Sequence, residues 1–186
     1  MPTFKAGGPE DARVARTRAD VSQAALTVLV EAGWEEVTHA RVAEMAGYSK
    51  TTLYTHWPSR FDLIAMALDG LGDMPHHEQT GDLRADVAGE LMVFRQAFVE
   101  LGLDRILSGL ALSASAGDVA ALRDRVNSRG QGPLRGLLAQ RFTGNRLEAA
   151  VAMLTGVVAC PSLMFGRLPD DGVINAAIDI VLSTAD

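Results

Sequence analysis

The sequence is poor in cysteine and in aromatic residues. Its one cysteine, Cys160, excludes an internal disulfide and a zinc site built on several thiolates. Aromatic residues make up only 5% of the chain while alanine and leucine are abundant, a balance that favours helices over sheets. We find no alternating strand pattern of useful length and no internal repeat. The first ten residues carry Pro, Gly and charge without an apolar stretch, so we expect no signal peptide and a cytoplasmic protein.

An excess of positive charge is also missing, since the net charge is −6. The deficit is uneven: residues 1–62 hold seven Lys/Arg against eight Asp/Glu, and residues 63–186 hold ten against fifteen. Phosphate binding depends on local charge, because salt screens charges beyond about 10 Å. The acidic balance therefore does not exclude nucleic-acid binding by the N-terminal part, although it predicts modest non-specific affinity.

Apolar periodicity and helix-ending residues predict an all-helical chain. In the N-terminal part we expect helices at 11–32, 38–46, 50–57 and 59–71, the last one opened by a capping box of Ser59 and Asp62. Beyond a polar linker at 72–81, further helices are expected at about 83–101, 104–116, 118–141, 146–166 and 172–184. The predicted organisation is a disordered arm (1–10), a helix-turn-helix DNA-binding domain (11–58), a connecting helix (59–72) and a C-terminal helical domain (73–186).

The two short helices at 38–46 and 50–57 have what a helix-turn-helix requires. Ala43 is small at the expected helix crossing, and Gly47 gives the turn a residue that tolerates positive φ. Leu53 and Trp57 lie four residues apart and point inward. The polar residues that remain on the outside can reach base edges and phosphates in a major groove: Lys50, Thr51, Thr52, Thr55 and His56.

The stretch from Val37 to Arg60, VTHARVAEMAGYSKTTLYTHWPSR, closely resembles the DNA-binding signature of the TetR family of transcriptional regulators. It has a threonine at the second helix, an Ala-Gly-x-Ser turn, a Thr-Leu-Tyr core and an aromatic-Pro-Ser-basic exit. The resemblance covers residues 13–70, and the rest of the chain agrees with the family by the number and length of its helices. It implies a three-helix DNA-binding domain followed by a helical ligand-binding and dimerisation domain.

The resemblance implies a set of DNA contacts: Thr38, His39, Arg41, Tyr48, Ser49, Lys50, Thr51, Thr52, Tyr54, Thr55, His56 and Arg60. Within this set, Thr38, Tyr54 and Arg60 look like phosphate contacts. Lys50, Thr51, Thr55 and His56 look like base contacts, and Thr52 suits either role. Three arginines of the first helix fit DNA contacts and a solvated helix face equally well: Arg13, Arg16 and Arg18.

The stretch from Ala149 to Phe165 has no charge and is apolar on nearly every face. Such a helix must be buried all round, so we expect it to pack on its own domain and on a second subunit, with Cys160 as a buried thiol. A membrane span is a minor alternative, because the stretch is short and contains Gly156 and Pro161. In the family the last two long helices join the subunits, which predicts a dimer interface at Val151, Leu154, Val158, Ile174, Ile178 and Val181.

The expected ligand pocket is less specific. Its candidates suit an apolar cavity with a few polar points, although each one also fits an ordinary core: Met92, Phe94, Phe98, Leu110, Ser113, Met153 and Phe165. The adjacent His76, His77 and Glu78 lack the spacing of a helical metal site, so we expect a solvated loop there. We expect neither a metal nor a cofactor.

The sequence as a whole predicts a regulator rather than an enzyme, since no catalytic arrangement stands out. We expect a homodimer that binds a palindromic double-stranded operator and is released by a small-molecule effector, without a membrane partner. Two alternatives remain: a DNA-binding regulator that needs no ligand, and an all-helical enzyme that binds small molecules. Repression and activation are both compatible with the sequence.

Overall fold

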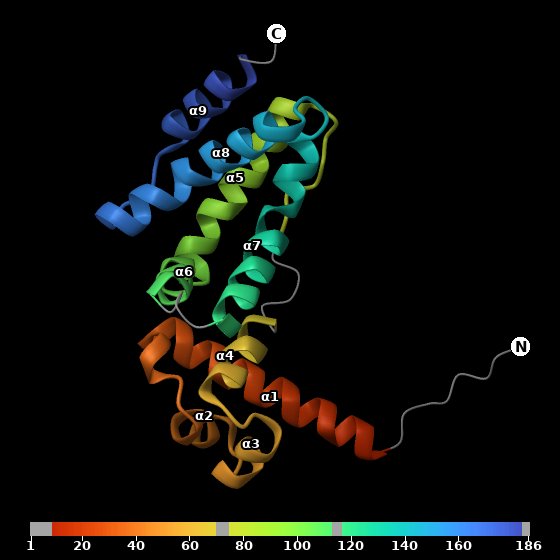
Figure 1. Ribbon diagram of the computed structural model, residues 1–186, viewed down its shortest axis with the longest axis vertical. Helices are drawn as coiled ribbons and strands as arrows, with labels where there is room; N and C mark the ends of the chain where they lie inside the picture. Colours follow the sequence, from red (N-terminus) through yellow and green to blue (C-terminus); the bar gives the residue numbers. More distant parts are fainter. Residues whose placement is uncertain (1–8, 70–74, 113–116, 184–186) are drawn as a thin grey trace, which may run out of the picture. The chain divides into compact units, whose positions relative to one another are not determined.

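The computed structural model describes residues 9–69, 75–112 and 117–183. All regular structure in these ranges is helical, which confirms the predicted fold class (Figure 1). The chain divides into two compact units, Met1–Gly72 and Asp73–Asp186. Residues 1–8 of the expected N-terminal arm lie outside the described ranges, whereas its last residues, Pro9 and Glu10, already belong to the first helix.

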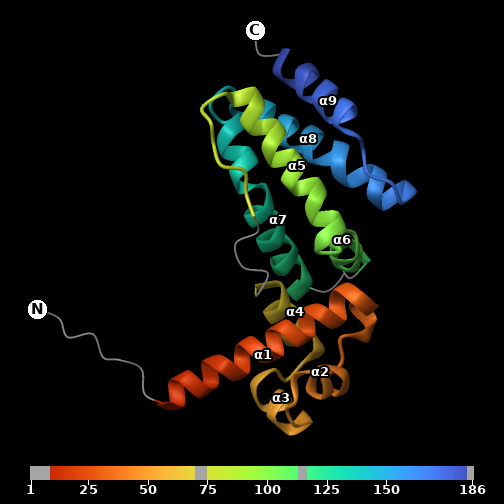
Figure 2. The same ribbon diagram turned by 180° about the vertical axis from the view of Figure 1, so that it is seen from behind.

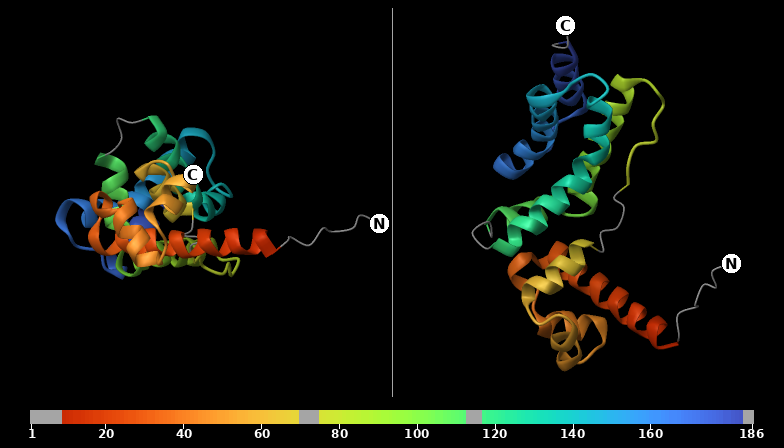
Figure 3. Two further views of the ribbon diagram at one scale, coloured as in Figure 1. Left: turned by 90° about the horizontal axis from the view of Figure 1, so that it is seen from below. Right: turned by 45° about the vertical axis from the view of Figure 1, so that its right-hand side comes forward.

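The first unit consists of α1 (Pro9–Ala32), a short 3-10 helix η1 (Trp34–Glu36), α2 (His39–Ala46), α3 (Lys50–His56) and α4 (Arg60–Asp69). Helix α1 packs against α2 and α4, and its N-terminal part projects beyond them (Figure 3, right). The core residues that hold these helices together are almost completely buried: Val21, Ala25, Leu29, Val42, Leu53 and Leu63. Each buried Val or Leu stabilises the fold by roughly 1.5–3 kcal/mol.

The second unit is built around α5 (Leu83–Glu100), which packs against α6 (Leu103–Leu112), α7 (Gly117–Leu138), α8 (Gly144–Phe165) and α9 (Asp171–Ser183) (Figure 2). Its core comes from every one of these helices, and its largest fully buried side chains include Leu91, Ile106, Leu122, Leu137, Leu154 and Ile174. Short connections follow α5 and precede α9. The helices that they join therefore stay close to each other and contribute to one common core.

Helices α8 and α9 bury the residues that the sequence assigned to a dimer interface, and this assignment is wrong. The expected interface residues are at most 4% exposed within a single chain: Val151, Leu154, Val158, Ile174, Ile178 and Val181. They form the contact of α8 and α9 with each other and with α5. An all-apolar helix does not reveal from sequence which stripe faces its own core, because every stripe is hydrophobic enough.

The opposite side of α8 and α9 is apolar and uncovered. We call it the α8–α9 outer face and define it by Met153, Leu163, Met164, Phe165, Val173 and Ile180, which are 45–70% exposed. Cys160 of α8 is also exposed in the single chain, so its burial requires a second subunit and stays a prediction. Within the described ranges α8 is the one helix long and apolar enough to cross a membrane, which is weak evidence on its own, and 22% of its apolar window is buried.

The expected pocket residues separate into four groups. Phe94, Phe98 and Leu110 lie in the second unit's interior or at its edge, where the Phe94 and Phe98 rings meet edge-on at 5.3 Å. Met92 is half-buried. Met153 and Phe165 are exposed on the α8–α9 outer face, so their assignment to an internal pocket is wrong. Ser113 lies outside the described residues.

Residues 75–82, which we call the strap, precede α5; most of them are exposed, and hydrogen bonds attach several of them to α5. Asp86 of α5 accepts hydrogen bonds from the Thr80 N–H and hydroxyl, both at 2.7 Å, and from the Gly81 N–H at 3.0 Å. One turn further, Glu90 accepts the His77 N–H at 2.9 Å. Between them Gly89 leaves room for the His77 ring, since a Cβ there would lie 2.3 Å from its Cγ. The expected solvated loop is confirmed for His76, which is exposed, whereas His77 is half-buried against α5.

Replacing Asp86 by Asn should destabilise the second unit. Hydrogen bonds from the Thr80 N–H, then from the Thr80 hydroxyl and the Gly81 N–H, lower the pKa of Asp86 despite its burial. Because the folded pKa lies below the unfolded value of about 3.9, the carboxylate stabilises the fold above that pH and loses this effect as the pH falls through the folded pKa. We expect Asp86→Asn to lower Tm at pH 7 by roughly 5 °C.

The difference between wild type and variant should shrink as the pH of the thermal melt is lowered below about 4. A matched control is Asp179→Asn, which removes an exposed carboxylate bound by Arg84 at 2.7 Å. Exposed ion pairs contribute little, so this control should melt close to the wild type. An equal loss of Tm in both variants would contradict the role assigned to Asp86.

Candidate nucleic-acid interface

The hairpin of α2 and α3 is capped where the sequence predicts. Thr38 begins α2 and its side chain accepts the Arg41 N–H at 3.3 Å. Ser49 begins α3 and accepts the Thr52 N–H at 3.1 Å. Gly47 ends α2 in the left-handed region with φ 74°, a conformation that glycine adopts without strain. These local bonds fix the angle between the helices and leave one side of α3 uncovered.

His39 differs from its expected role as a DNA contact. The residue is only 7% exposed, and its Nε2 lies 2.6 Å from the carbonyl oxygen of Trp57, just after α3. Because a carbonyl only accepts, the imidazole donates from Nε2. The ring also stacks on Tyr54 with centroids 3.9 Å apart. The side chain of His39 thus joins the start of α2 to the end of α3, and the expectation that it contacts DNA is corrected.

Helix α3 presents a polar outer surface. Lys50, Thr51, Tyr54, Thr55 and His56 are exposed, and Leu53 is completely buried beneath them. The Thr55 hydroxyl donates to the Thr51 carbonyl at 2.8 Å, which turns the threonine methyl outward from that bond. Thr52 is half-buried and its hydroxyl lies 2.8 Å from that of Ser49. A helix of this width with Lys and Thr at its first turn fits a major groove.

Two expected DNA-contacting arginines are paired with glutamates of η1. Arg60 donates from Nη1 to Glu35 Oε2 at 2.8 Å, and Arg41 donates from Nη1 to Glu36 Oε2 at 2.5 Å. The hydrogen bond and the charge of Arg60 lower the pKa of Glu35, which stays ionised at neutral pH. A phosphate that binds either arginine has to compete with this carboxylate. The sequence did not reveal that Glu35 and Glu36 pair with these arginines, because the paired residues lie 25 and 5 positions apart in the chain.

The N-terminal part of α1 contributes cations to the same surface. Arg13 and Arg18 line an open groove of about 700 Å³ together with Tyr48, Thr52 and His56. The Tyr48 hydroxyl donates to Asp20 Oδ2 at 2.8 Å, which attaches the turn after α2 to α1. This bond lies at the surface, so a DNA contact by the Tyr48 hydroxyl stays a prediction and has to compete with Asp20. The sequence left the α1 arginines undecided, and their place beside α3 favours a DNA contact.

Among the residues that the structure describes, no group of three or more His, Cys, Asp or Glu side chains is placed to hold a metal ion. His76 and His77 instead contact Glu90 and Asp86 at 3.3 and 3.4 Å.

The capping box predicted at the start of α4 is present, since Asp62 accepts the Ser59 N–H at 2.8 Å and donates its own N–H to the Ser59 hydroxyl at 3.1 Å.

Comparison with known proteins identifies the same region. Residues 21–67 match the model of the family described as bacterial regulatory proteins, tetR family. An uncharacterized HTH-type transcriptional regulator of Mycobacterium tuberculosis is 25% identical over 166 residues, which cover 84% of this chain and 81% of that protein. The DNA-binding transcriptional repressor TetR of Mycobacteroides abscessus is 35% identical over 74 residues, 39% of each chain.

A solved structure extends the similarity to both units. The TetR family transcription regulator SCO0332 is 28% identical, with a TM-score of 0.68 over 90% of this chain and 97% of that one. The matched family model spans the last part of α1 through most of α4, where the hairpin and its capping residues lie. This chain is a member of the TetR family of helix-turn-helix transcriptional regulators, non-enzymatic proteins that bind DNA through this N-terminal domain.

Proposed function

We propose that the protein is a cytoplasmic repressor that binds a palindromic operator as a homodimer and releases it when a small molecule binds the second unit. The observation that carries the proposal is that the chain combines a polar, exposed recognition helix with a second helical unit that has an uncovered apolar face. The Mycobacteroides abscessus relative is itself named a repressor, which supports repression over activation.

The α8–α9 outer face supports dimerisation. Its exposed apolar residues recur at helical spacing, as Met153, Cys160 and Met164 along α8 and Val173 and Ile180 along α9. A contiguous apolar surface of this kind marks a protein contact, and a two-fold axis lets the same surface serve both partners. A dimer also presents two recognition helices to half-sites about 34 Å apart or a multiple of that distance.

Binding selection from random duplex DNA tests the proposal. Purified protein should enrich a palindromic motif, and its affinity for that motif should fall steeply as salt is raised. Enrichment of a single half-site without its inverted copy would contradict operator binding as a dimer. Screening small molecules against the complex with the selected operator then tests the effector response, because a true effector lowers operator affinity and operator lowers effector affinity by the same factor.

Neutralising Glu35 should strengthen DNA binding. Glu35→Gln removes the carboxylate that holds Arg60, so the guanidinium becomes available to a phosphate and one repulsive charge disappears. We expect about two- to fivefold tighter binding to specific and non-specific DNA alike, with a salt dependence steeper by about one counterion. The measurement is fluorescence anisotropy over a salt series. Glu44→Gln removes an exposed acidic charge of α2 as a control, and an equal gain there would contradict release of Arg60.

A further inference from the structure

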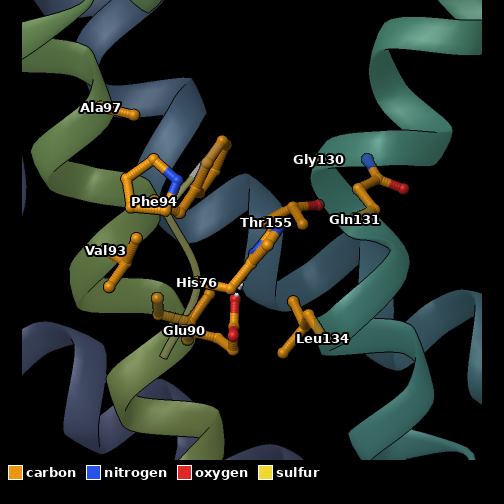
Figure 4. Close-up of a pocket in the computed structure, with 11 residues that line it drawn as sticks. His76, Glu90, Val93, Phe94, Ala97, Gly130, Gln131, Leu134 and Thr155 are labelled. Atoms are coloured by element: carbon orange, nitrogen blue, oxygen red, sulfur yellow. Dashed lines mark hydrogen bonds and ion pairs between the residues drawn. The ribbon is translucent and has the colours of Figure 1, made fainter. Parts of the chain in front are cut away.

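A small cavity of the second unit contains an imidazole of the chain itself. The cavity lies between α5, α7 and α8, and its volume of about 20 Å³ is room for one water molecule. Its walls include the apolar side chains of Leu91, Phe94 and Leu134. Figure 4 shows the His76 side chain between α5 and α7, beside Glu90. A ring of the strap thus fills a site that would otherwise be larger.

Glu90 gives this cavity a buried carboxylate. The residue is 6% exposed, and its Oε1 accepts the His77 N–H at 2.9 Å. Its Oε2 lies 3.3 Å from His76 Nδ1, and because an ionised carboxylate only accepts, the imidazole donates. A buried carboxylate requires donors or a positive charge close by. Oε2 is therefore paired with the nitrogen donor of a flat ring, and that ring contacts aromatic and aliphatic side chains of the cavity wall.

His76 is held more loosely than Thr80 of the same strap. Its side chain is 34% exposed, and its bond to Glu90 is longer than the 2.7 Å bonds that Thr80 makes with Asp86. The contacts of Thr80 and Gly81 with Asp86 do not involve His76. The imidazole can therefore leave the cavity while the C-terminal part of the strap stays bound to α5.

We propose that this cavity binds a flat nitrogen heterocycle with an N–H donor, which replaces the His76 imidazole against Glu90. The inference rests on the proposed function, in which the second unit holds the effector site. Because the His76 ring is attached to the chain, it is present at the site at an effective concentration in the millimolar range. A ligand that displaces it therefore needs more apolar surface than imidazole has. A fused bicyclic ring such as benzimidazole has that surface. Its binding frees the start of the strap, which follows α4 in the sequence.

A His76→Ala variant tests the site with imidazole as the probe. Calorimetry should show imidazole binding at least about tenfold more tightly to this variant than to the wild type. Thiazole has the same shape but carries no N–H that could donate to Glu90, and it should bind about tenfold more weakly than imidazole. Adding Glu90→Gln to His76→Ala should remove this preference. Equal binding of the two rings, no binding of either, or a preference that survives Glu90→Gln would overturn the proposal.

The wild-type protein provides a test without any substitution. Millimolar benzimidazole should shift the side-chain nitrogen resonances of His76 in a ¹H–¹⁵N spectrum, and resonances that stay unchanged would overturn displacement. Operator affinity measured on the same samples separates the two ideas. Benzimidazole that displaces His76 without changing operator affinity upholds the cavity and contradicts the proposed effector response, whereas weaker operator binding supports both.

Discussion

Replacing Ile180 by Asp should make the protein monomeric and weaken operator binding by at least about 100-fold, because a charge at the centre of an apolar interface costs several kcal/mol. Ile180 is 59% exposed on the α8–α9 outer face and contributes nothing to the core through that exposed part. The monomer should therefore keep its fold, and its Tm should no longer depend on protein concentration. Analytical ultracentrifugation gives the oligomeric state, and fluorescence anisotropy with the selected operator gives the affinity.

Val99→Asp is the matched control for this experiment. Val99 is 73% exposed on α5, away from α8 and α9 in the sequence, and the same charge there should leave both mass and affinity unchanged. Cys160 provides a second measurement, since the exposed thiol should react with a bulky maleimide faster in Ile180→Asp than in the wild type. A wild-type protein that is monomeric at micromolar concentration, or a dimeric Ile180→Asp, would contradict an interface on this face.

The second large effect is expected at Lys50, the first residue of α3. Lys50→Ala should weaken binding to the selected operator by about 10- to 100-fold and change the preferred base at one position of each half-site, as lost base contacts do. Binding to random duplex DNA should change far less. Repeating the selection from random DNA with the variant gives both quantities.

Tyr54→Phe is the comparison for Lys50→Ala. It removes only the hydroxyl from an exposed side chain and keeps the ring that stacks on His39. If Tyr54 contacts phosphate, its loss should weaken all sequences by a similar, smaller factor without changing the preferred motif. A uniform loss from Lys50→Ala, with an unchanged motif, would instead place Lys50 among the phosphate contacts.

The predictable parts of the fold depend on neighbouring residues. The caps at Thr38 and Ser49 and the turn at Gly47 follow from side chains that bond or strain the backbone within a few positions. The helix boundaries in both units follow from the same local signals and from apolar periodicity. This is why the helix-turn-helix could be located to within a residue or two without any structure.

The wrong predictions all depend on partners that are distant or ambiguous. On α8, Leu154 and Met153 are adjacent and both apolar, yet one is buried and the other is 55% exposed. Which of the two side chains is buried depends on where α5 and α9 lie, and the local sequence does not encode that position. His77 has the same difficulty, since its shelter depends on the missing side chain of Gly89. Polar residues bound to a helix beyond the next loop look like solvated residues in the sequence.

The bond between His39 and Trp57 closes the α2–α3 hairpin into a ring. The turn at Gly47 joins the helices at one end, and the imidazole joins them at the other. A helix of seven residues is not stable alone, so its shape is set by this ring and not by contacts with DNA. In the proposed mechanism an effector then changes the distance between two recognition helices but not the surface that each one presents. Induction of this protein should alter how tightly it holds its operator and leave its choice of sequence intact.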